Sequence, residues 1–475
     1  MQQERYDHWI GGQSVPPETG SYFAVCNPLE DTKLAEAAAG SVTDINRAVE
    51  TAHQAFQSFR HTLPKERERI MCKAAEILER DRQDFINILV DEIGSPIKKA
   101  GFEVEKAITF FRSSASMARS ATGKTIPSDA PGKFSMSIRS PIGVIAAITP
   151  FNVPLIKGSR LSCNPIALGN TVVMMPSEEA PVLAYRLAEL YKEAGLPDGV
   201  FNVVSGDGYE IGDALTSHPL VKMVTFTGSC RVGKHIQELC GQLGKPATLE
   251  LGGKSPLVIM ADADLSAAMP GAIQSIFMYQ GQVCMGASRI YVQREIFDGF
   301  VKKFAAVAGN LGMGDLRDES TVIGPIISER QRARVKGHIE DARKKGATIV
   351  TGGDWEGNRC QPTVLTGVTP EMDVYYQETF GPVTSIYPFD TLDEALTYSN
   401  DSDFGLSAGI YTQNLKDAMR YVHEVESGMV HVNGAILHDE PTVPFGGVKD
   451  SGFGREGTDE DIEAMTEWKW VTIQM

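Results

Sequence analysis

The chain of 475 residues lacks several features that would assign it to other classes of protein. No window approaches 18 uninterrupted apolar residues, the length typical of a membrane-spanning helix. The first thirty residues are polar and include Pro16 and Pro17, so they carry no apolar signal-peptide core. The seven cysteines are scattered, without a CxxC pair or a metal-ligand spacing, which favours a reducing compartment. We therefore expect a soluble, cytoplasmic protein that binds no metal.

Basic residues are also scarce relative to acidic ones. The chain has 45 Lys and Arg against 61 Asp and Glu, a formal net charge of −16 and a pI near 5.1. Such a field repels nucleic acid and anionic membrane surfaces, and neither is expected as a partner. The basic run 331–336 lies in an amphipathic stretch and is predicted to be a solvated helix.

The sequence pattern changes near residue 142. Residues 43–121 carry apolar side chains at helical spacing, which predicts a helical opening segment. From residue 142 short apolar runs alternate with helical patterns, and a second such series begins after Gly253, so we predict two α/β lobes with parallel sheets. Residues 133–140 and 468–473 also look like strands. The other predicted strands are 142–148, 171–175, 201–204, 221–226, 256–260, 289–292, 347–351 and 383–388, and the predicted helices are 155–168, 180–194, 209–217, 230–241, 264–280 and 295–310.

Two reactive side chains stand in glycine-rich surroundings. Cys284 lies in the segment YQGQVCMG (279–286), and Glu250 lies upstream in LELGGK (249–254). A cysteine attacks as the thiolate, and we place Cys284 near a helix start, where the helix dipole would lower its pKa. A glutamate at a strand end can activate water when partial burial raises its pKa. Five other cysteines are expected to pack in the core: Cys26, Cys72, Cys163, Cys240 and Cys360.

Two further segments carry groups suited to binding. Asn152 follows an apolar run and Pro150, and its amide can donate a hydrogen bond to an oxyanion. The loop GSCRVG (228–233), which contains Cys230, closes one predicted strand and opens a helix, a favourable setting for a pyrophosphate. A literal GxGxxG occurs at 452–457, but no βαβ unit surrounds it, so we interpret it as a false positive.

These segments occur in the order found in the aldehyde dehydrogenase superfamily, together with ETFGP (378–382) and PFGG (444–447). The chain resembles that superfamily over nearly its whole length. The resemblance implies a Rossmann-like parallel-sheet NAD-binding domain (1–122 and 142–252) and a second α/β catalytic domain (253–448). It also implies a small β arm for oligomerisation (123–141 and 449–475), in a homodimer or homotetramer.

The same resemblance implies roles for individual residues. Cys284 would be the nucleophile, Asn152 the oxyanion donor and Glu250 the general base. Glu178 matches the position that binds the adenosine ribose hydroxyls, and a carboxylate there would repel a 2′-phosphate, so NAD is preferred over NADP. The implied cofactor-binding residues are Ile148, Thr149, Pro150, Phe151, Met175, Ser177, Glu178, Gly208, Phe226, Gly228, Ser229, Val232, Gly233, Leu251, Glu378 and Phe380. The implied substrate-tunnel residues are Val153, Arg160, Met278, Val283, Met285 and Phe445.

The chain departs from the common family pattern in ways that bear on ligands. Met175 replaces a Lys that helps to hold the adenosine ribose, and losing such a charged hydrogen bond costs about 1.5–3 kcal/mol, so we expect weaker NAD binding. Phe151 replaces a common Trp, which leaves Asn152 unaffected. Leu161 replaces another frequent Lys. The Arg160 before it and the segment 432–440 resemble the salicylaldehyde, vanillin and benzaldehyde dehydrogenase branch, which predicts an aromatic or bulky aldehyde.

Three hypotheses remain open. In the first, an aldehyde is oxidised to the acid through a cysteine thiohemiacetal and a thioester that Glu250-activated water hydrolyses. In the second, the thioester passes to coenzyme A or phosphate, although a water-activating Glu250 argues against it. In the third, the chain is a structural or binding protein on a retired enzyme fold, which intact Cys284, Glu250 and Asn152 disfavour. NADH production with and without coenzyme A separates the three.

Overall fold

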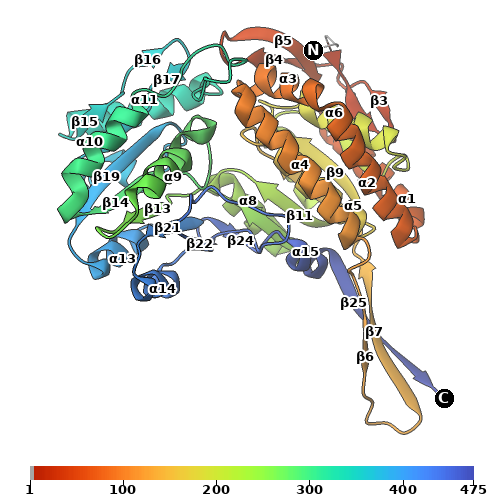
Figure 1. Cartoon of the computed structure of the whole chain (residues 1–475). Helices are drawn as coiled ribbons and strands as arrows, with labels where there is room; N and C mark the ends of the chain where they lie inside the picture. Colours follow the sequence, from red (N-terminus) through yellow and green to blue (C-terminus); the bar gives the residue numbers. More distant parts are fainter. Residues whose placement is uncertain (1–4) are drawn as a thin grey trace.

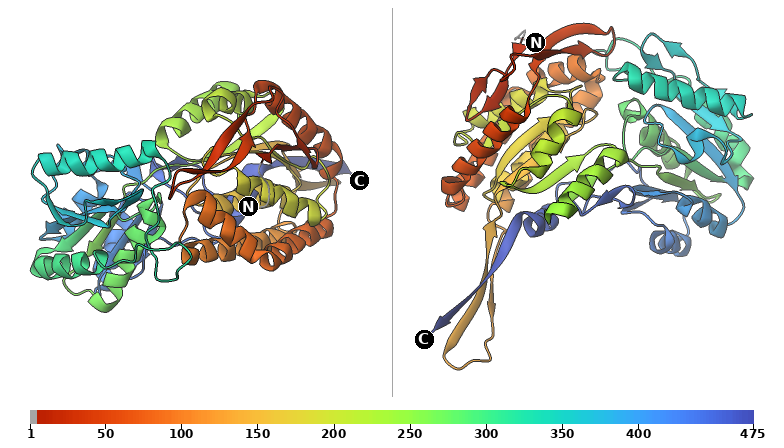
Figure 2. Two further views of the ribbon diagram at one scale, coloured as in Figure 1. Left: turned by 90° about the horizontal axis from the view of Figure 1, so that it is seen from above. Right: turned by 180° about the vertical axis from the view of Figure 1, so that it is seen from behind.

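The computed structural model describes residues 5–475 and consists of two α/β lobes with a long β arm (Figure 1). This confirms the predicted α/β class. An eight-stranded sheet forms the centre of the first lobe, in the order β24-β12-β11-β8-β9-β10-β2-β3. A seven-stranded sheet forms the centre of the second lobe, in the order β15-β18-β19-β14-β13-β21-β22. Figure 2 shows the two lobes side by side from above and from behind.

The first lobe contains the predicted helical opening segment and the first series of predicted strands. Five neighbouring strands, from β12 to β10, run parallel, and helices cover the sheet on both faces. The strands are β2 (His8–Ile10), β3 (Gln13–Val15), β8 (Val144–Thr149), β9 (Thr171–Pro176), β10 (Phe201–Val203), β11 (Val221–Thr227), β12 (Ala247–Glu250) and β24 (Gly452–Phe453). The helices are α1 (Val42–Phe59), α2 (Pro64–Arg80), α3 (Arg82–Ile93), α4 (Ile97–Met117), α5 (Pro154–Ala167), α6 (Val182–Glu193), α7 (Gly208–Ser217) and α8 (Cys230–Leu243).

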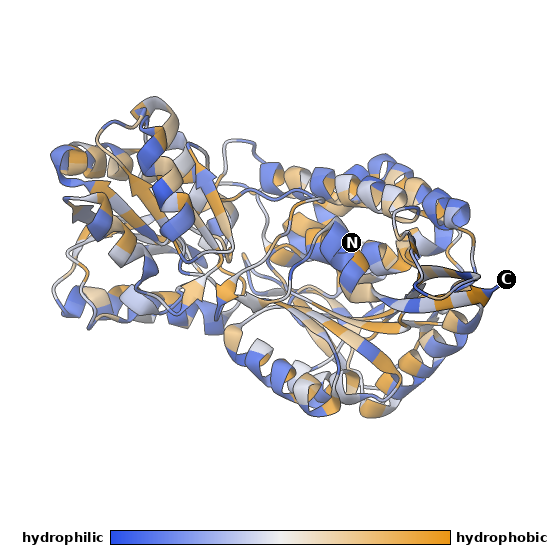
Figure 3. Ribbon diagram, turned by 90° about the horizontal axis from the view of Figure 1, so that it is seen from below, coloured by the Kyte–Doolittle hydropathy of each residue, from blue (hydrophilic) through white to orange (hydrophobic). Residues whose placement is uncertain are grey.

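Burial on both faces explains why these strands read as continuous apolar runs. Every residue of β8 and β9 is buried, as expected for parallel strands covered on two sides. The core on one face is shared by α2, α4, α5 and α6, and the core on the other face by α1, α7 and α8. Figure 3 shows the resulting pattern, with apolar strands inside and hydrophilic residues on the outer sides of the helices.

The second lobe repeats this design. Its strands are parallel except for β15, which pairs antiparallel with β18. The strands are β13 (Pro256–Ile259), β14 (Arg289–Gln293), β15 (Thr348–Thr351), β18 (Thr363–Thr366), β19 (Val383–Phe389), β21 (Ser407–Tyr411) and β22 (Met429–Val432). The helices are α9 (Leu265–Phe277), η1 (Met278–Gly281), η2 (Arg294–Ile296), α10 (Phe297–Ala308), α11 (Glu329–Lys344), α12 (Asp373–Tyr376), α13 (Leu392–Asn400) and α14 (Leu415–Glu424).

The β arm projects away from both lobes (Figure 1). It consists of β6 (Lys124–Ile126), β7 (Lys133–Pro141) and β25 (Thr466–Gln474), and β7 and β25 pair antiparallel over their whole lengths. This confirms the two strand predictions at 133–140 and 468–473. The 449–475 segment divides between two places, because β24 joins the first sheet and α15 (Thr458–Met465) then leads into β25. Small additional strands are β1 (Arg5–Tyr6), β4 (Tyr22–Asn27), β5 (Thr32–Ala38), β16 (Trp355–Glu356), β17 (Arg359–Cys360), β20 (Phe404–Gly405) and β23 (Val448–Lys449).

Two cysteine predictions are wrong. Cys26 and Cys72 are exposed, whereas Cys163, Cys240 and Cys360 are buried as expected. Cys26 lies on the edge strand β4 and Cys72 on the outer side of α2, and the hydrophobicity of one residue does not determine which face of its element it occupies. Within residues 5–475, no helix combines the length and apolar character needed to cross a membrane.

Candidate active site

The candidate residues gather where the strands of the first sheet end and the second lobe begins. β8 leads into Asn152, β11 into Gly228, and β12 ends at Glu250. Open parallel sheets bind ligands at this edge, beyond the carboxyl ends of their strands. The second lobe contributes Cys284 and Glu378, and the N–H of Gly253 donates to Glu378 Oε1 at 2.9 Å. Loops from both lobes therefore meet at one place.

Cys284 lies in a turn between η1 and β14, and its side chain is partly exposed. The turn packs tightly, since a Cβ atom at Gly253 would come within 2.1 Å of the Cys284 carbonyl oxygen. Our prediction of a helix start at Cys284 is wrong, because the next element is the strand β14. The predicted lowering of its pKa is wrong as well. Burial raises the pKa of Cys284 to about 12, and Lys157 opposes this shift.

The side chain of Asn152 points toward the nucleophile loop. Its amide Nδ2 donates to the backbone carbonyl of Gln282 at 2.9 Å, two residues before Cys284. Asn152 is buried, so few water molecules compete for this donor. The structure thus brings the Asn152 amide to the loop that carries Cys284, although the sequence separates the two by more than a hundred residues.

Glu250 is the last residue of β12, and its carboxyl group is buried with no hydrogen-bond partner among residues 5–475. Burial raises the pKa of Glu250 well above its ordinary range, and the nearby Glu456 carboxylate adds to this effect. A raised pKa makes the ionised carboxylate a stronger proton acceptor, as a general base requires. The absence of a side chain at Gly446 leaves space for the Glu250 carboxyl group, because a Cβ atom there would lie 2.7 Å from Glu250 Oε1.

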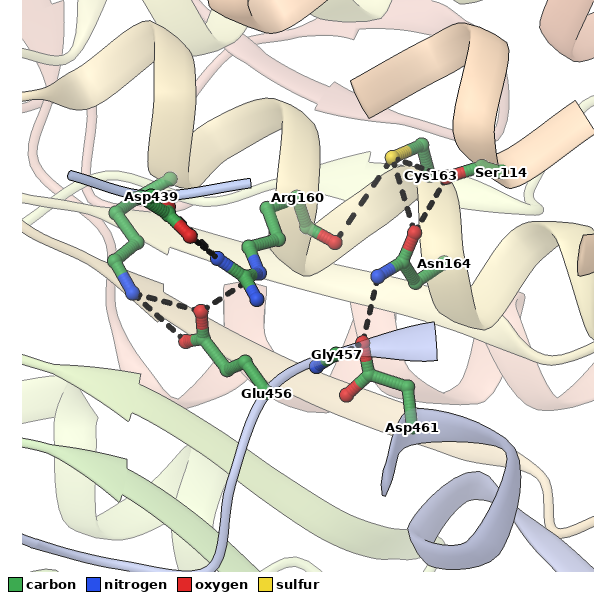
Figure 4. Close-up of polar contacts among 9 residues, drawn as sticks. Ser114, Arg160, Cys163, Asn164, Asp439, Glu456, Gly457 and Asp461 are labelled. Carbon is green, nitrogen blue, oxygen red and sulfur yellow. Dashed lines mark hydrogen bonds and ion pairs between the residues drawn. The ribbon is translucent and has the colours of Figure 1, made fainter. Parts of the chain in front are cut away.

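A buried network of charges stands beside Glu250. Lys157 donates to both oxygens of Glu456 at 2.8 and 2.9 Å. Arg160 lies 3.0 Å from Glu456 through Nε and donates to both oxygens of Asp439 at 2.9 and 3.1 Å. Figure 4 shows the Arg160 guanidinium between these two carboxylates. The 452–457 segment that resembles a nucleotide fingerprint therefore supplies Glu456 to this network, and its β24 pairs with the strand that ends at Glu250.

The glycine loop after β11 is shaped for close packing. Ser229 caps α8, and its Oγ accepts the N–H of Val232. A Cβ atom at Gly233 would come within 2.3 Å of Leu251, so only glycine lets α8 approach the segment after β12 this closely. Free N–H groups at such a helix start suit a pyrophosphate. Cys230 in the same loop donates to the Asp450 carbonyl at 3.1 Å.

Residues at two further places fit a dinucleotide. Phe380 has a positive φ of 53°, packs edge-on against Phe151 with ring centroids 5.9 Å apart, and is held by Gln331, which donates to its carbonyl at 2.8 Å. At the second place, Glu178 follows β9 and is exposed, and its Oε1 lies 4.0 Å from Arg330 Nη2. The predicted cofactor positions lie in or directly after β8, β9, β11 and β12, in the first turns of α7 and α8, and between α12 and β19. They are Ile148, Thr149, Pro150, Phe151, Met175, Ser177, Glu178, Gly208, Phe226, Gly228, Ser229, Val232, Gly233, Leu251, Glu378 and Phe380.

The predicted substrate-tunnel residues differ in solvent exposure. Val153, Met278 and Met285 are partly exposed, whereas Val283, Phe445 and Arg160 are buried. The Arg160 guanidinium forms ion pairs with two carboxylates and lies 5.2 Å from the centre of the Phe445 ring. Its contacts within the protein are therefore structural.

The sequence analysis missed five polar residues around the site: Lys99, Glu103, Lys157, Gln282 and Glu456. One signal for Lys157 was available. All fourteen residues of α5 are buried, and its only charged residues are Lys157 and Arg160. A helix with so few charged residues is expected to be buried, and a buried charge needs a partner.

Comparison with known proteins adds four findings. The profile of the aldehyde dehydrogenase family matches residues 15–471. A vanillin dehydrogenase of Pseudomonas fluorescens is 41% identical over 468 residues, which cover 98% of this chain and 97% of that protein. The structure of a salicylaldehyde dehydrogenase from Pseudomonas putida G7, complexed with salicylaldehyde, matches with a TM-score of 0.96 at 35% identity over 100% of this chain and 99% of that one. An NADP-dependent enzyme of E. coli matches with the same TM-score at 36% identity, over 99% and 98%.

Proposed function

Because the chain belongs to the aldehyde dehydrogenase family, we propose that it oxidises an aromatic or bulky aldehyde to the carboxylic acid, with NAD as the hydride acceptor. In this proposal Cys284 is the nucleophile, Asn152 the oxyanion donor and Glu250 the general base. The observation that carries it is the hydrogen bond from Asn152 to the Gln282 carbonyl, which directs an amide at the loop that bears the partly exposed Cys284 thiol.

The first half of the reaction forms a thioester on Cys284. The thiol gives its proton to solvent water, and the thiolate sulfur attacks the aldehyde carbon to give a thiohemiacetal oxyanion. The Asn152 amide turns from the Gln282 carbonyl to the new oxyanion and stabilises it. Bound NAD supplies the acceptor for the hydride that leaves this carbon. The nicotinamide would lie near Glu378 and Phe380, and the pyrophosphate near Gly228 and Ser229.

The second half releases the acid. Glu250 takes a proton from a water molecule, whose oxygen attacks the thioester carbon, and Cys284 leaves as the thiolate. The network of Lys157, Glu456 and Arg160 fixes the charges that surround Glu250 during this step. Hydrolysis distinguishes this function from transfer to coenzyme A, because only hydrolysis needs a base for water.

The choice of NAD rests on Glu178. Solved relatives include an NADP-dependent enzyme, so family membership alone implies a nicotinamide cofactor of either kind. An exposed carboxylate after β9 would bind ribose hydroxyls and repel a 2′-phosphate. Met175 offers no charge here, and its methyl group lies 3.9 Å from where a Cβ atom of Gly208 would be, so it forms an apolar surface at the start of α7.

The preference for an aromatic aldehyde rests on the apolar tunnel candidates and on the relatives, which are named for vanillin and salicylaldehyde. Phe445, Val283, Met278 and Met285 offer apolar and polarisable surface to a ring. We also propose a homodimer or homotetramer assembled through the β arm, which exposes Trp470 and Ile473 to solvent.

One experiment tests the function. NADH formation is followed by absorbance over a panel of aromatic and aliphatic aldehydes, with NADP as rival cofactor and with coenzyme A present or absent. Turnover that favours aromatic aldehydes, needs no coenzyme A and disappears in Cys284→Ala supports the proposal. Dependence on coenzyme A would identify an acylating enzyme, and no turnover with any aldehyde would favour a non-catalytic protein.

A further inference from the structure

Lys99 is a buried cation between the two loops that carry the proposed chemistry. It stands in the first turn of α4, and its side chain is 6% exposed. Its ammonium group donates to Glu103 Oε2 at 2.8 Å and to the backbone carbonyl of Asn152 at 2.9 Å. It also lies 4.9 Å from the centre of the Tyr279 ring, within range of a cation–π contact. Its three partners come from three different segments of the chain.

Glu103 extends this connection to the helix that follows Asn152. Its side chain is fully buried, and its second oxygen accepts the N–H groups of Leu155 and Ile156 at 2.9 and 3.4 Å. These donors belong to the first turn of α5, where a carboxylate is favoured by the helix dipole. The pair Lys99 and Glu103 therefore holds the chain at the Asn152 carbonyl and at the start of the helix that follows it.

The loop under the Lys99 ammonium has an unusual backbone. Tyr279 and Gln280 have φ values of 62° and 56°, which non-glycine residues seldom adopt. Neighbouring contacts hold this conformation, since Gln280 donates to the Gly94 carbonyl at 3.2 Å and Gln282 Oε1 accepts the Ile327 N–H at 3.1 Å. A small cavity marks the junction and is lined by Ile93, Lys99, Phe151, Asn152, Tyr279, Gln280 and Gln282.

A buried ion pair is a weak source of stability, because desolvation of the two charges offsets their attraction. The charged pair instead restrains geometry, because an ammonium group with three N–H donors fixes the position of each acceptor that it contacts. The acceptor that matters for the reaction is the Asn152 carbonyl, because the Asn152 side chain points at the Gln282 carbonyl.

We propose that Lys99 is a positioning residue for the acylation step and acts by fixing the Asn152 peptide from which the oxyanion donor projects. The inference rests on the proposed function, since it assumes that Asn152 stabilises the thiohemiacetal oxyanion. Lys99 itself contacts neither the aldehyde nor the thiol. Small displacements of a catalytic group can cost about 100-fold in rate, so loss of this anchor affects the chemistry more than binding.

The test compares Lys99→Met and Lys99→Arg with a matched control, Lys106→Met. Lys106 stands on the same helix and also donates to a backbone carbonyl, that of Asp439 at 2.8 Å, away from Asn152. We expect Lys99→Met to lower kcat/KM for the aldehyde by about 10-fold to 100-fold. Lys99→Arg restores part of the loss because it retains the charge, and Lys106→Met changes kcat/KM much less. Equal losses in the two Met variants would overturn the proposal.

A double-mutant cycle shows whether Lys99 acts through Asn152. In an Asn152→Ala background, Lys99→Met should add little further loss, because the group that it positions is gone. Fully additive losses would overturn the proposal while leaving the role of Asn152 intact. Alkylation of Cys284 by iodoacetamide needs no oxyanion donor, so its rate should be unchanged in Lys99→Met. A fall as large as that in kcat/KM would assign Lys99 to the nucleophile loop instead.

Lys99→Met leaves Glu103 buried without its cation, so the single variant can fail to fold. The double variant Lys99→Met with Glu103→Gln removes both charges and keeps an acceptor for the Leu155 N–H. It should fold with a melting temperature near that of the unmodified protein and show the same loss of kcat/KM. Activity close to that of the unmodified protein would overturn the proposal. Absence of aldehyde oxidation by the unmodified protein would overturn the proposed function and this inference together.

Discussion

The ammonium group of Lys157 contacts both carboxylate oxygens of Glu456, at 2.8 and 2.9 Å, inside the protein. Burial opposes ionisation of Glu456, but Lys157 and Arg160 outweigh it and hold the Glu456 pKa below its ordinary value. The neighbouring Glu250 shows the opposite shift, because burial and the Glu456 charge raise its pKa. The pKa values of these two buried carboxyl groups thus shift in opposite directions, an arrangement that suits different tasks for two similar side chains.

Removing Lys157 should destabilise the protein strongly. In Lys157→Met, Glu456 remains buried with one cation fewer, and breaking a buried pair costs about 3–5 kcal/mol. Thermal unfolding followed by fluorescence should show a clear fall in Tm, and adding Glu456→Gln should recover part of it. Lys73→Met breaks the exposed pair with Glu76 and serves as the control, with little expected change. An unchanged Tm for Lys157→Met would contradict the argument.

Glu250→Gln should separate the two halves of the reaction. Acylation and hydride transfer do not need the base, so the variant should release about one equivalent of NADH per site. Steady turnover should then fall by about 10²-fold to 10⁴-fold. Rapid mixing that follows NADH absorbance measures both phases. Continued fast turnover after the burst would show that another group activates the water.

The raised pKa of Glu250 also predicts a pH-dependent stability difference. Above the unfolded pKa of about 4.3, the unfolded chain ionises while the folded protein still holds the proton, so this residue costs more stability as pH rises towards its folded pKa. Glu250→Gln removes that cost. Its Tm relative to the unmodified protein should therefore be higher at pH 8 than at pH 4. A constant difference across this range would mean that burial does not raise the pKa.

The Cys284 thiol should react slowly in the ligand-free protein at neutral pH. Since its pKa is raised to about 12, the thiolate fraction should increase about tenfold per pH unit between roughly pH 7 and 9. Alkylation by iodoacetamide, read on the Cys284 peptide by mass spectrometry, should show this slope. Cys26 and Cys72 are exposed and provide internal references in the same sample. A plateau below pH 8 would indicate an activated thiolate at rest.

Glu178→Gln should weaken the preference for NAD over NADP. The substitution keeps a hydrogen-bonding group for the ribose but removes the charge that repels a 2′-phosphate. Dissociation constants for both dinucleotides, from quenching of tryptophan fluorescence, should move closer together, mainly through tighter NADP binding. The neighbouring Glu179→Gln is the control, because it removes the same charge from a partly exposed residue one position away. An unchanged ratio in Glu178→Gln would place the discrimination elsewhere.

Trp470→Glu should reduce the size of the assembly. Trp470 is 73% exposed on β25, and a charge placed in an interface built on this strand would be buried without a partner. Light scattering on a sizing column gives the mass directly. Lys469→Glu adds negative charge on the other face of the strand as a comparison. An identical mass for Trp470→Glu and the unmodified protein would exclude this face of the arm as the interface.

Local pattern was sufficient for much of the fold. The apolar run 171–175 became β9 and the longer stretch 155–168 became α5, because buried strands are short and buried helices are longer. The resemblance to the vanillin and salicylaldehyde dehydrogenase branch is confirmed by relatives that match along nearly the whole chain. The roles of Cys284, Glu250 and Asn152 remain predictions.

Long-range contacts could not be predicted in the same way. Glu456 lies 299 residues from Lys157, and no local pattern indicates that the two meet. The helix start expected at Cys284 failed for a related reason. Tyr279 and Gln280 take left-handed backbone angles that tertiary contacts maintain, and neither residue type signals such a turn.

The pairing of β24 with β12 has a consequence for biosynthesis. Glu250 and Glu456, whose carboxylate adds to the raised pKa of Glu250, are separated by about 200 residues of chain. At 5–20 residues per second, translation takes roughly 10 to 40 s to cover that interval. A first lobe that folds during this time would have β12 as an unpaired edge of its sheet. A chaperone that protects the nascent chain would be expected to cover this edge.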